Sequence, residues 1–250
     1  MKRVLLIVAY DGTRYHGWQL QPMVATIESE LNKALSALFH EDIKVIGASR
    51  TDTGVHALSN IAVFDTMATM PAEKIVYALN QRLPEDIRIQ SSQEVPIDFH
   101  PRHQNSKKTY VYKIVNRAFP LPTVRLYTHF TYVPLDVELM RQAAEYLVGE
   151  HDFKSFCSAN TIAETTIRTI YSISVEKIDE MISIRVTGSG FLYNMVRIIA
   201  GTLIEVGRGN ILPQKIEEIL RACDRTKAGP TAPACGLTLE KYEFLDMDIG

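Results

Sequence analysis

The residue types best suited to chemistry are concentrated in one stretch, SRTDTGVHA, at positions 49–57. If a rigid turn held Asp52, its carboxylate could act as a nucleophile or as a general base. Arg50 is close enough in sequence to favour ionisation of that carboxylate or to bind a phosphate. The alternative is a purely structural turn, in which Asp52 bonds to its own downstream backbone and Gly54 supplies a positive φ angle.

Thr51 and His56, in the same stretch, are expected to support the turn. His56 could relay a proton, but a buried and hydrogen-bonded ring is the commoner role for such a histidine, and it is the interpretation we favour. Apolar runs at positions 43–46 and 61–64 flank the stretch. We therefore expect a strand on each side of it, with the turn at an edge of the sheet.

Three residues elsewhere also have side chains suited to a site. Arg197 lies in the otherwise apolar helical pattern MVRII, where a charge needs a partner. A carboxylate such as Asp52 is a natural partner, and a structural ion pair elsewhere is equally compatible with the sequence. Tyr110 and Tyr112 follow two lysines; both could be core aromatics, or one could stack on a base.

Other patterns do not indicate a cofactor or a metal. The sequence Gly188-Ser189-Gly190 lacks the third glycine of a dinucleotide fingerprint and has no Walker lysine after it. His100 and His103 have no third ligand nearby in the sequence. The three cysteines show no CxxC spacing, which argues against a disulfide framework or a structural zinc site and fits reduced thiols in the cytoplasm.

The basic residues are distributed unevenly, although the net charge is only −2. The segment 99–135 holds six of the 27 Lys and Arg residues, Lys107 and Lys108 among them, and no Asp or Glu, so its formal charge is +6. The other 21 basic residues are outnumbered by 29 acidic ones, which gives −8. Aromatic residues alternate with these charges, so the segment indicates a nucleic-acid partner, with a solvated basic loop as the alternative.

Hydrophobic periodicity predicts the elements that position these residues. In the first half we expect strands at 4–10, 43–48 and 61–65 and from residue 87, with helices that begin at Thr26 and Pro71. In the second half we expect strands at 109–115, 170–175, 181–186 and 237–244, and helices after Asp136 and over 193–206 and 213–223.

Each half thus follows the approximate order strand, helix, strand, strand, helix, strand, which favours two α+β domains of the split βαβ kind. We place the boundary so that residues 1–104 carry the Asp52 turn and residues 105–250 carry Tyr110 and the Arg197 helix. No apolar run approaches the ~20 residues of a membrane span. The start, MKRVLLIVAYDG, is interpreted as a first strand rather than a signal peptide.

The SRTDTGVHA stretch resembles the active-site motif of the tRNA pseudouridine synthase A family. Four further stretches resemble that family in the same order, from about Val4 to the last strand: AYDGTRYHGWQLQP, FHPRHQNSKKTYVYKI, SGFLYNMVRIIAGTLIEVGRG and KAGPTAPACGLTLEKYEF. One departure is visible, because the family usually has glycine before the motif arginine and this chain has Ser49.

The resemblance implies the pseudouridine synthase fold, in which two split-βαβ (ferredoxin- or RRM-like) halves with mainly antiparallel sheets flank a central RNA-binding cleft. It implies a cytoplasmic isomerase that converts uridine to pseudouridine in the anticodon stem-loop of tRNA. Such an enzyme works as a homodimer with tRNA as its partner, does not act at a membrane, and needs no cofactor and no metal.

Residue by residue, Asp52 takes the position of the family's catalytic aspartate, and Tyr110 that of the tyrosine that stacks on the target base. Arg197 falls where the family has an arginine paired with the catalytic carboxylate. Arg50 falls where an arginine contacts the flipped-out nucleotide, and Leu237 where an apolar wall lies behind the base. Supporting roles are expected for Thr51, Gly54, His56, Lys107 and Lys108.

The expected reaction accounts for these residue types. The N1–C1′ bond breaks, the uracil rotates and C5 bonds to C1′, so the overall bond count is unchanged. A carboxylate can attack the sugar or the base, or remove a proton from C2′, and the sequence does not choose among these routes. Two other functions also stay open: a non-catalytic RNA-binding protein, and a pseudouridine synthase that acts on another RNA.

Overall fold

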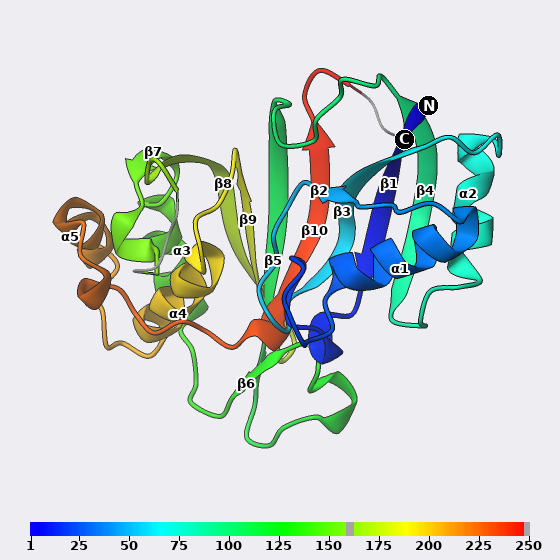
Figure 1. Ribbon diagram of the computed structural model, residues 1–250. Helices are drawn as coiled ribbons and strands as arrows, with labels where there is room; N and C mark the ends of the chain where they lie inside the picture. The colour runs from blue at the N-terminus through cyan, green and yellow to red at the C-terminus, as the bar shows by residue number, and fades with distance from the viewer. Residues whose placement is uncertain (159–162, 248–250) are drawn as a thin grey trace. The chain divides into compact units, whose positions relative to one another are not determined.

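The computed structural model of the protein describes residues 1–158 and 163–247 (Figure 1). The chain divides into two compact units, one formed by Met1–Asn105 with Leu239–Gly250 and the other by Ser106–Thr238. The C-terminal residues thus belong with the first unit, whereas the domain prediction grouped them with the second half. In the part of the chain described, no helix is long and apolar enough to cross a membrane.

The first unit is a mainly antiparallel sheet with two helices. Its strand order is β4-β1-β3-β10, and β2 pairs with β3. The elements are β1 (Lys2–Tyr10), α1 (Ile27–Phe39), β2 (Ile46–Gly47), β3 (His56–Thr66), α2 (Ala72–Asn80), β4 (Ile87–Val95) and most of β10 (Leu237–Phe244). The pairings of β1 with β3, β1 with β4 and β2 with β3 are antiparallel.

Strand β1 lies in the middle of this sheet because its side chains are apolar on both faces. Val4, Leu5 and Leu6 are each 0% exposed, as a continuous apolar run predicts for a strand covered on both sides. Leu5 belongs to a core cluster with residues of β3, β4 and β10. Helix α1 buries Ile27, Leu31, Ala34 and Leu35, which recur at helical spacing.

The strands of the second unit follow the order β5-β9-β8-β7 with antiparallel pairings of β5 with β9, β9 with β8 and β8 with β7, and β6 pairs in parallel with β5. Its elements are β5 (Ser106–Asn116), β6 (His129–Thr131), α3 (Val137–Glu145), β7 (Gly149–Asp152), β8 (Ile167–Ile178), β9 (Met181–Gly188), α4 (Met195–Gly207) and α5 (Lys215–Ala222). Helix α4 is buried along most of its length, as expected for a helix that is apolar on nearly all sides.

Several sequence predictions are confirmed. Thr26 caps α1, where its hydroxyl accepts from Ser29 N at 3.2 Å and Ser29 Oγ accepts from Thr26 N at 3.0 Å. Asp136 caps α3, because its carboxylate accepts from Glu138 N and Leu139 N. The α+β class and the mainly antiparallel pairing also hold. A cleft between the two halves stays a prediction.

Two element predictions were wrong at their boundaries. The expected strand at 43–48 is only the two-residue β2, because helix side chains take its backbone groups: Ile43 N donates to Ser36 Oγ at 3.0 Å and Val45 N to Asn32 Oδ1 at 2.8 Å. Strand β3 begins at His56, five residues before the predicted start, so the end of the SRTDTGVHA stretch already belongs to the sheet.

Candidate active site

The turn that carries Asp52 is a four-residue β-turn directly before β3. The carbonyl of Asp52 accepts from Val55 N at 3.1 Å, and Gly54 at the third position has φ +78°. A positive φ at that position is what a type II turn requires and glycine supplies. The structural interpretation of the stretch is therefore correct. It is compatible with the functional one, because the turn leaves the Asp52 side chain half-buried rather than enclosed.

A segment that follows β1 braces this turn from the side. Trp18 N donates to Thr51 O at 3.0 Å, and Gly54 N donates to Tyr15 O at 3.3 Å. Gly17, at φ +82°, approaches so closely that an added Cβ would lie 2.6 Å from Thr51 O. This brace was not predicted from the sequence, although glycines at positions 12 and 17 and a single tryptophan signal a close backbone approach.

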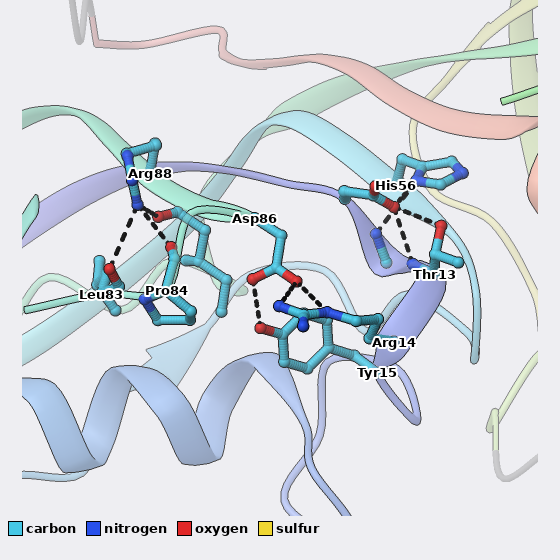
Figure 2. A network of polar contacts seen from close by, with 11 residues as sticks. Thr13, Arg14, Tyr15, His56, Leu83, Pro84, Asp86 and Arg88 are labelled. Carbon is cyan, nitrogen blue, oxygen red and sulfur yellow. Dashed lines mark hydrogen bonds and ion pairs between the residues drawn. The ribbon is translucent and has the colours of Figure 1, made fainter. Parts of the chain in front are cut away.

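Asp86 anchors the bracing segment to the start of β4, as Figure 2 shows. Its carboxylate accepts from Tyr15 Oη at 2.6 Å and from Arg14 Nε at 2.8 Å. Its carbonyl accepts from Asp11 N at 2.9 Å. Burial, and then the hydrogen bond to Asp86, raise the pKa of Tyr15, so the hydroxyl remains a donor. Asp86 thus fixes the bracing segment at Asp11, Arg14 and Tyr15.

His56 is a buried, hydrogen-bonded ring, as we favoured. It is 4% exposed, and Gly12 N donates to its Nδ1 at 3.1 Å. Asp11 Oδ1 also lies 3.1 Å from Nδ1. Gly12 and Asp11, both in the segment after β1, therefore hold the same ring nitrogen of His56. The ring joins the first residue of β3 to the bracing segment (Figure 2).

The brace gives a testable stability difference between two glycines with positive φ. Gly17→Ala would strain the backbone and also push a methyl group into Thr51 O, whereas Gly209 (φ +78°) has nothing within 4 Å of an added Cβ. We expect Gly17→Ala to be more destabilising than Gly209→Ala by about 1–3 kcal/mol, the usual cost of overpacking. Urea unfolding of both variants measures this, and equal losses would mean that the brace is not tightly packed.

Two arginines gather positive charge beside the turn. The Arg50 side chain is exposed, and Arg102 is held by a hydrogen bond from its Nε to Gly47 O at 2.8 Å. Partial burial, and then the nearby charge of Arg50, lower the pKa of Arg102. The positive charges of Arg50 and Arg102 together favour the binding of an anion beside the turn. The sequence predicted Arg102 only as one residue of the basic segment 99–135, and not as a neighbour of the turn.

His100 and His103, two histidines of the basic segment 99–135, stack on each other. The rings of His100 and His103 lie 4.0 Å apart, centroid to centroid. Among the residues that the structure describes, no group of three or more His, Cys, Asp or Glu side chains is placed to hold a metal ion. The three cysteines are all free thiols.

Tyr110 lies on β5 of the second unit and is 8% exposed. Its ring meets Phe191 edge to face, with centroids 5.2 Å apart and an interplanar angle of 85°. This geometry is favourable for aromatic pairs and sets the plane of the tyrosine ring. Phe191 comes from the SGFLYNMVR stretch, so the residues before α4 help to orient Tyr110.

Arg197 is oriented by residues on both sides of it. Its Nε donates to Ala232 O at 2.8 Å and its Nη1 donates to Asn194 Oδ1 at 2.8 Å. Asn194 has φ +61° and also donates from Nδ2 to Ser158 Oγ at 2.9 Å. Leu237 begins β10 and is 5% exposed. The predicted pairing of Arg197 with Asp52 stays a prediction.

Not every positive charge of the basic segment 99–135 is available to an anionic partner. Arg117 Nη1 lies 3.2 Å from Glu180 Oε2, so one of the six positive charges is compensated. Lys107 and Lys108 are partly exposed on β5. The structure thus places Asp52, Arg50, Thr51, Gly54 and His56 together in the first unit, and Tyr110, Arg197, Leu237, Lys107 and Lys108 in the second.

An aspartate on a braced turn, flanked by arginines in an α+β fold, is suited to a carboxylate-dependent enzyme with an anionic substrate. The family model described as tRNA pseudouridine synthase matches residues 6–104 and 143–244. The chain therefore belongs to the tRNA pseudouridine synthase family.

Individual relatives agree with this over nearly the whole chain. A protein of Thermoanaerobacter sp. (strain X514) named tRNA pseudouridine synthase A is 48% identical over 244 residues, 98% of this chain and 100% of that one. The protein of the same name from Brevibacillus brevis is 49% identical over 239 residues, 96% of this chain and 98% of that one. A solved Cbf5-Nop10-Gar1 complex contains a chain that is 13% identical, with a TM-score of 0.33 over 80% of this chain and 54% of that one, a similarity too low to bear on function.

Proposed function

We propose that this protein isomerises uridine to pseudouridine in the anticodon stem-loop of tRNA, with Asp52 as the reacting carboxylate. The tRNA pseudouridine synthase activity itself follows from the family. Beyond that activity, we propose which stem-loop of the tRNA is modified and what the individual residues do. The observation that carries it is the Asp52 turn, which is braced by the backbone contacts of Trp18 and Tyr15 and yet leaves the carboxylate half-buried.

A braced carboxylate suits this reaction because little reorganisation is needed when the glycosidic bond breaks. Holding a reacting group in place before the reaction removes part of the entropic barrier. Each possible first step requires an ionised Asp52: attack on the sugar, attack on the base, or removal of the C2′ proton. Positive charge from Arg50, two residues away, favours that ionised form. In our proposal Arg197 supplies a second positive charge.

Tyr110 is proposed to receive the flipped-out base. Base flipping costs a few kcal/mol, and stacking on an aromatic ring returns about 1–3 kcal/mol of that. The edge-to-face contact with Phe191 fixes the plane of the ring before the base arrives. After C5 bonds to C1′, the proton left on C5 must be removed, and the Tyr110 hydroxyl is our candidate for that step. Leu237 is proposed to form the apolar wall behind the base.

The basic residues are proposed to bind tRNA phosphates, and their contribution can be measured. Lys107→Ala with Lys108→Ala should weaken tRNA binding and lower the slope of log K against log salt by up to about 2, because each phosphate contact releases about one counterion. Filter binding at several salt concentrations gives this slope. The control, Lys177→Ala with Lys215→Ala, lies outside the segment. A slope unchanged in the first variant would show that neither lysine contacts phosphate.

We also propose a cytoplasmic homodimer, which the family resemblance implies. The three free cysteines fit a reducing compartment. Sedimentation equilibrium tests the dimer directly, and a mass of 28.2 kDa, that of one chain, would argue against it.

The substrate proposal is tested with three RNAs of similar size and charge: an unmodified tRNA anticodon stem-loop, the same stem-loop with its uridines replaced by cytidines, and an unrelated stem-loop. We expect pseudouridine only in the first. Tight binding of all three without product would favour a non-catalytic RNA-binding protein. Product in the unrelated RNA alone would favour a synthase for another RNA.

A further inference from the structure

A group of buried polar side chains lies under the Asp52 turn, outside the residues assigned to the reaction and to RNA binding. Tyr10 at the end of β1 is 5% exposed, and Asn60 in the middle of β3 is 0% exposed. They contact Ser49 and Thr51, which are 6% and 7% exposed and lead directly into Asp52. All of these residues belong to the first unit.

Every donor and acceptor position of the Asn60 side chain is occupied, and two of its hydrogen bonds are to the backbone of Ser49, just before the turn. Its Oδ1 accepts from Ser49 N at 3.2 Å and from Ile61 N at 2.9 Å. Its Nδ2 donates to Ser49 O at 2.9 Å and to Tyr10 Oη at 3.1 Å. A side-chain amide has two donors and two acceptor sites, so this one is saturated and its orientation is determined. The amide thereby holds both backbone groups of Ser49.

Tyr10 extends this network to Thr51. Its hydroxyl lies 2.7 Å from Thr51 Oγ1. Because the Tyr10 oxygen accepts from Asn60, its own hydrogen is available for Thr51, which gives a directed chain from Asn60 through Tyr10 to Thr51. Burial raises the pKa of Tyr10, so the hydroxyl does not lose that hydrogen near neutral pH. Thr51 O accepts in turn from Trp18 N at 3.0 Å.

The same contacts explain how Ser49 can stand where the family usually has a glycine before the motif arginine. Ser49 does not have a positive φ, so its backbone needs no glycine. Its N–H and C=O both bond to Asn60, which determines the path of the chain whatever small residue stands there.

A polar group at this depth is costly unless it is fully bonded, and apolar packing alone would stabilise β3 at least as well. Asn60 is followed in sequence by the apolar run Ile61-Ala62-Val63, so the core does not require an amide at that position. What the amide does is to fix the two residues on which the position of Asp52 depends.

We propose that Tyr10 and Asn60 are positioning residues for the isomerisation: through Thr51 and Ser49 they set where the Asp52 carboxylate stands. This inference rests on the proposed function, since it assumes that Asp52 reacts. It assigns no contact with the RNA to either residue. Their loss should therefore slow the reaction without weakening the binding of tRNA.

Tyr10→Phe is the sharpest test because it removes one oxygen atom and keeps the ring. In single-turnover reactions on an unmodified tRNA we expect the rate of pseudouridine formation to fall about 10- to 100-fold, the loss that a displacement of about 1 Å causes, with an unchanged dissociation constant for tRNA. The matched control is Tyr242→Phe, which removes another buried tyrosine hydroxyl of the same unit, bonded to Pro101 O at 3.1 Å. That control should react at the wild-type rate.

The only tryptophan of the chain reports whether the packing survives. Trp18 is 1% exposed, and its ring lies 5.9 Å from that of Tyr10. An emission spectrum unchanged between wild type and Tyr10→Phe, together with a slowed reaction, would separate mispositioning of the turn from loss of the fold.

Asn60→Asp adds a pH dependence that a purely structural role would not produce. The introduced carboxylate can still accept from Ser49 N, but when ionised it cannot donate to Ser49 O or to Tyr10. Burial raises the pKa of a carboxyl group, and below that pKa the group regains one donor. The rate relative to wild type should therefore rise as the pH is lowered from about 8 to about 6, at a temperature where Trp18 emission shows both proteins folded.

The outcomes separate the inference from the proposed function. Wild-type protein that forms no pseudouridine in the stem-loop would overturn the proposed function and the inference with it. An active wild type with Tyr10→Phe at the same rate would overturn the inference alone. So would a slowed Tyr10→Phe whose tRNA affinity falls by the same factor, or an Asn60→Asp rate that follows wild type at a constant ratio across pH.

Discussion

Asp52→Asn should abolish pseudouridine formation and leave tRNA binding in place. The substitution keeps the size and shape of the side chain but removes the negative charge that every possible first step requires. We expect the single-turnover rate to fall by about 10³-fold or more, as for the loss of a group that takes part directly in the reaction. The turn should survive, because its hydrogen bond uses the carbonyl of Asp52 and the amide of Val55. Rates are measured by nuclease digestion and chromatography of the product.

The control for this prediction is Asp42→Asn. Asp42 lies in the same unit, and its side chain is 87% exposed, so the change alters the net charge by the same amount without touching the turn. Wild-type rates in that control, and an unchanged tRNA dissociation constant in Asp52→Asn, would assign the loss to the chemistry. An Asp52→Asn protein that turns over normally would remove Asp52 from the mechanism.

Tyr110→Phe should separate stacking from proton removal. The phenylalanine ring keeps the edge-to-face contact with Phe191 and the surface on which a base stacks, so tRNA affinity should change little. Without the hydroxyl, the proton on C5 has no positioned acceptor, and the rate should fall about 10²- to 10⁴-fold. Release of tritium from tRNA labelled at uridine C5 measures that step directly.

A second variant at the same position checks the stacking role. Tyr110→Ala should lose the rate and also about 1–3 kcal/mol of binding to a stem-loop with a flipped base. Tyr171→Phe, on β8 and 49% exposed, serves as the control for removal of a tyrosine hydroxyl in the same unit. Equal rates for wild type and Tyr110→Phe would exclude the hydroxyl as the acceptor of the C5 proton.

The parts of the fold that are predictable from sequence are those determined by local chemistry. Thr26 and Asp136 stand directly before helical patterns, and each caps its helix. The apolar run of β1 correctly indicates a central strand. The prediction failed at 43–48, because the side chains that end that strand come from α1, and no local pattern shows that Asn32 will bond to Val45.

The site likewise contains residues that are predictable from their local sequence and residues that are recognised only from the structure. Asp52 is found from its residue type and its neighbours within nine positions. Tyr10, Asn60 and Asp86 were not found, because they act on residues far from them in sequence: Tyr10 and Thr51 are 41 residues apart, and Tyr15 and Asp86 are 71. Only Asn60 left a signal, as a polar residue at the start of an apolar run.

In our proposal, the Asp52 turn presents a carboxylate to a uridine of the anticodon stem-loop. The most direct test maps pseudouridine at single-nucleotide resolution in one unmodified tRNA after incubation with excess wild-type protein or excess Asp52→Asn. We expect pseudouridine in the anticodon stem-loop with wild type and none with the variant, although both bind the tRNA. Pseudouridine at the same nucleotides with both proteins, or with wild type only outside that stem-loop, would contradict it.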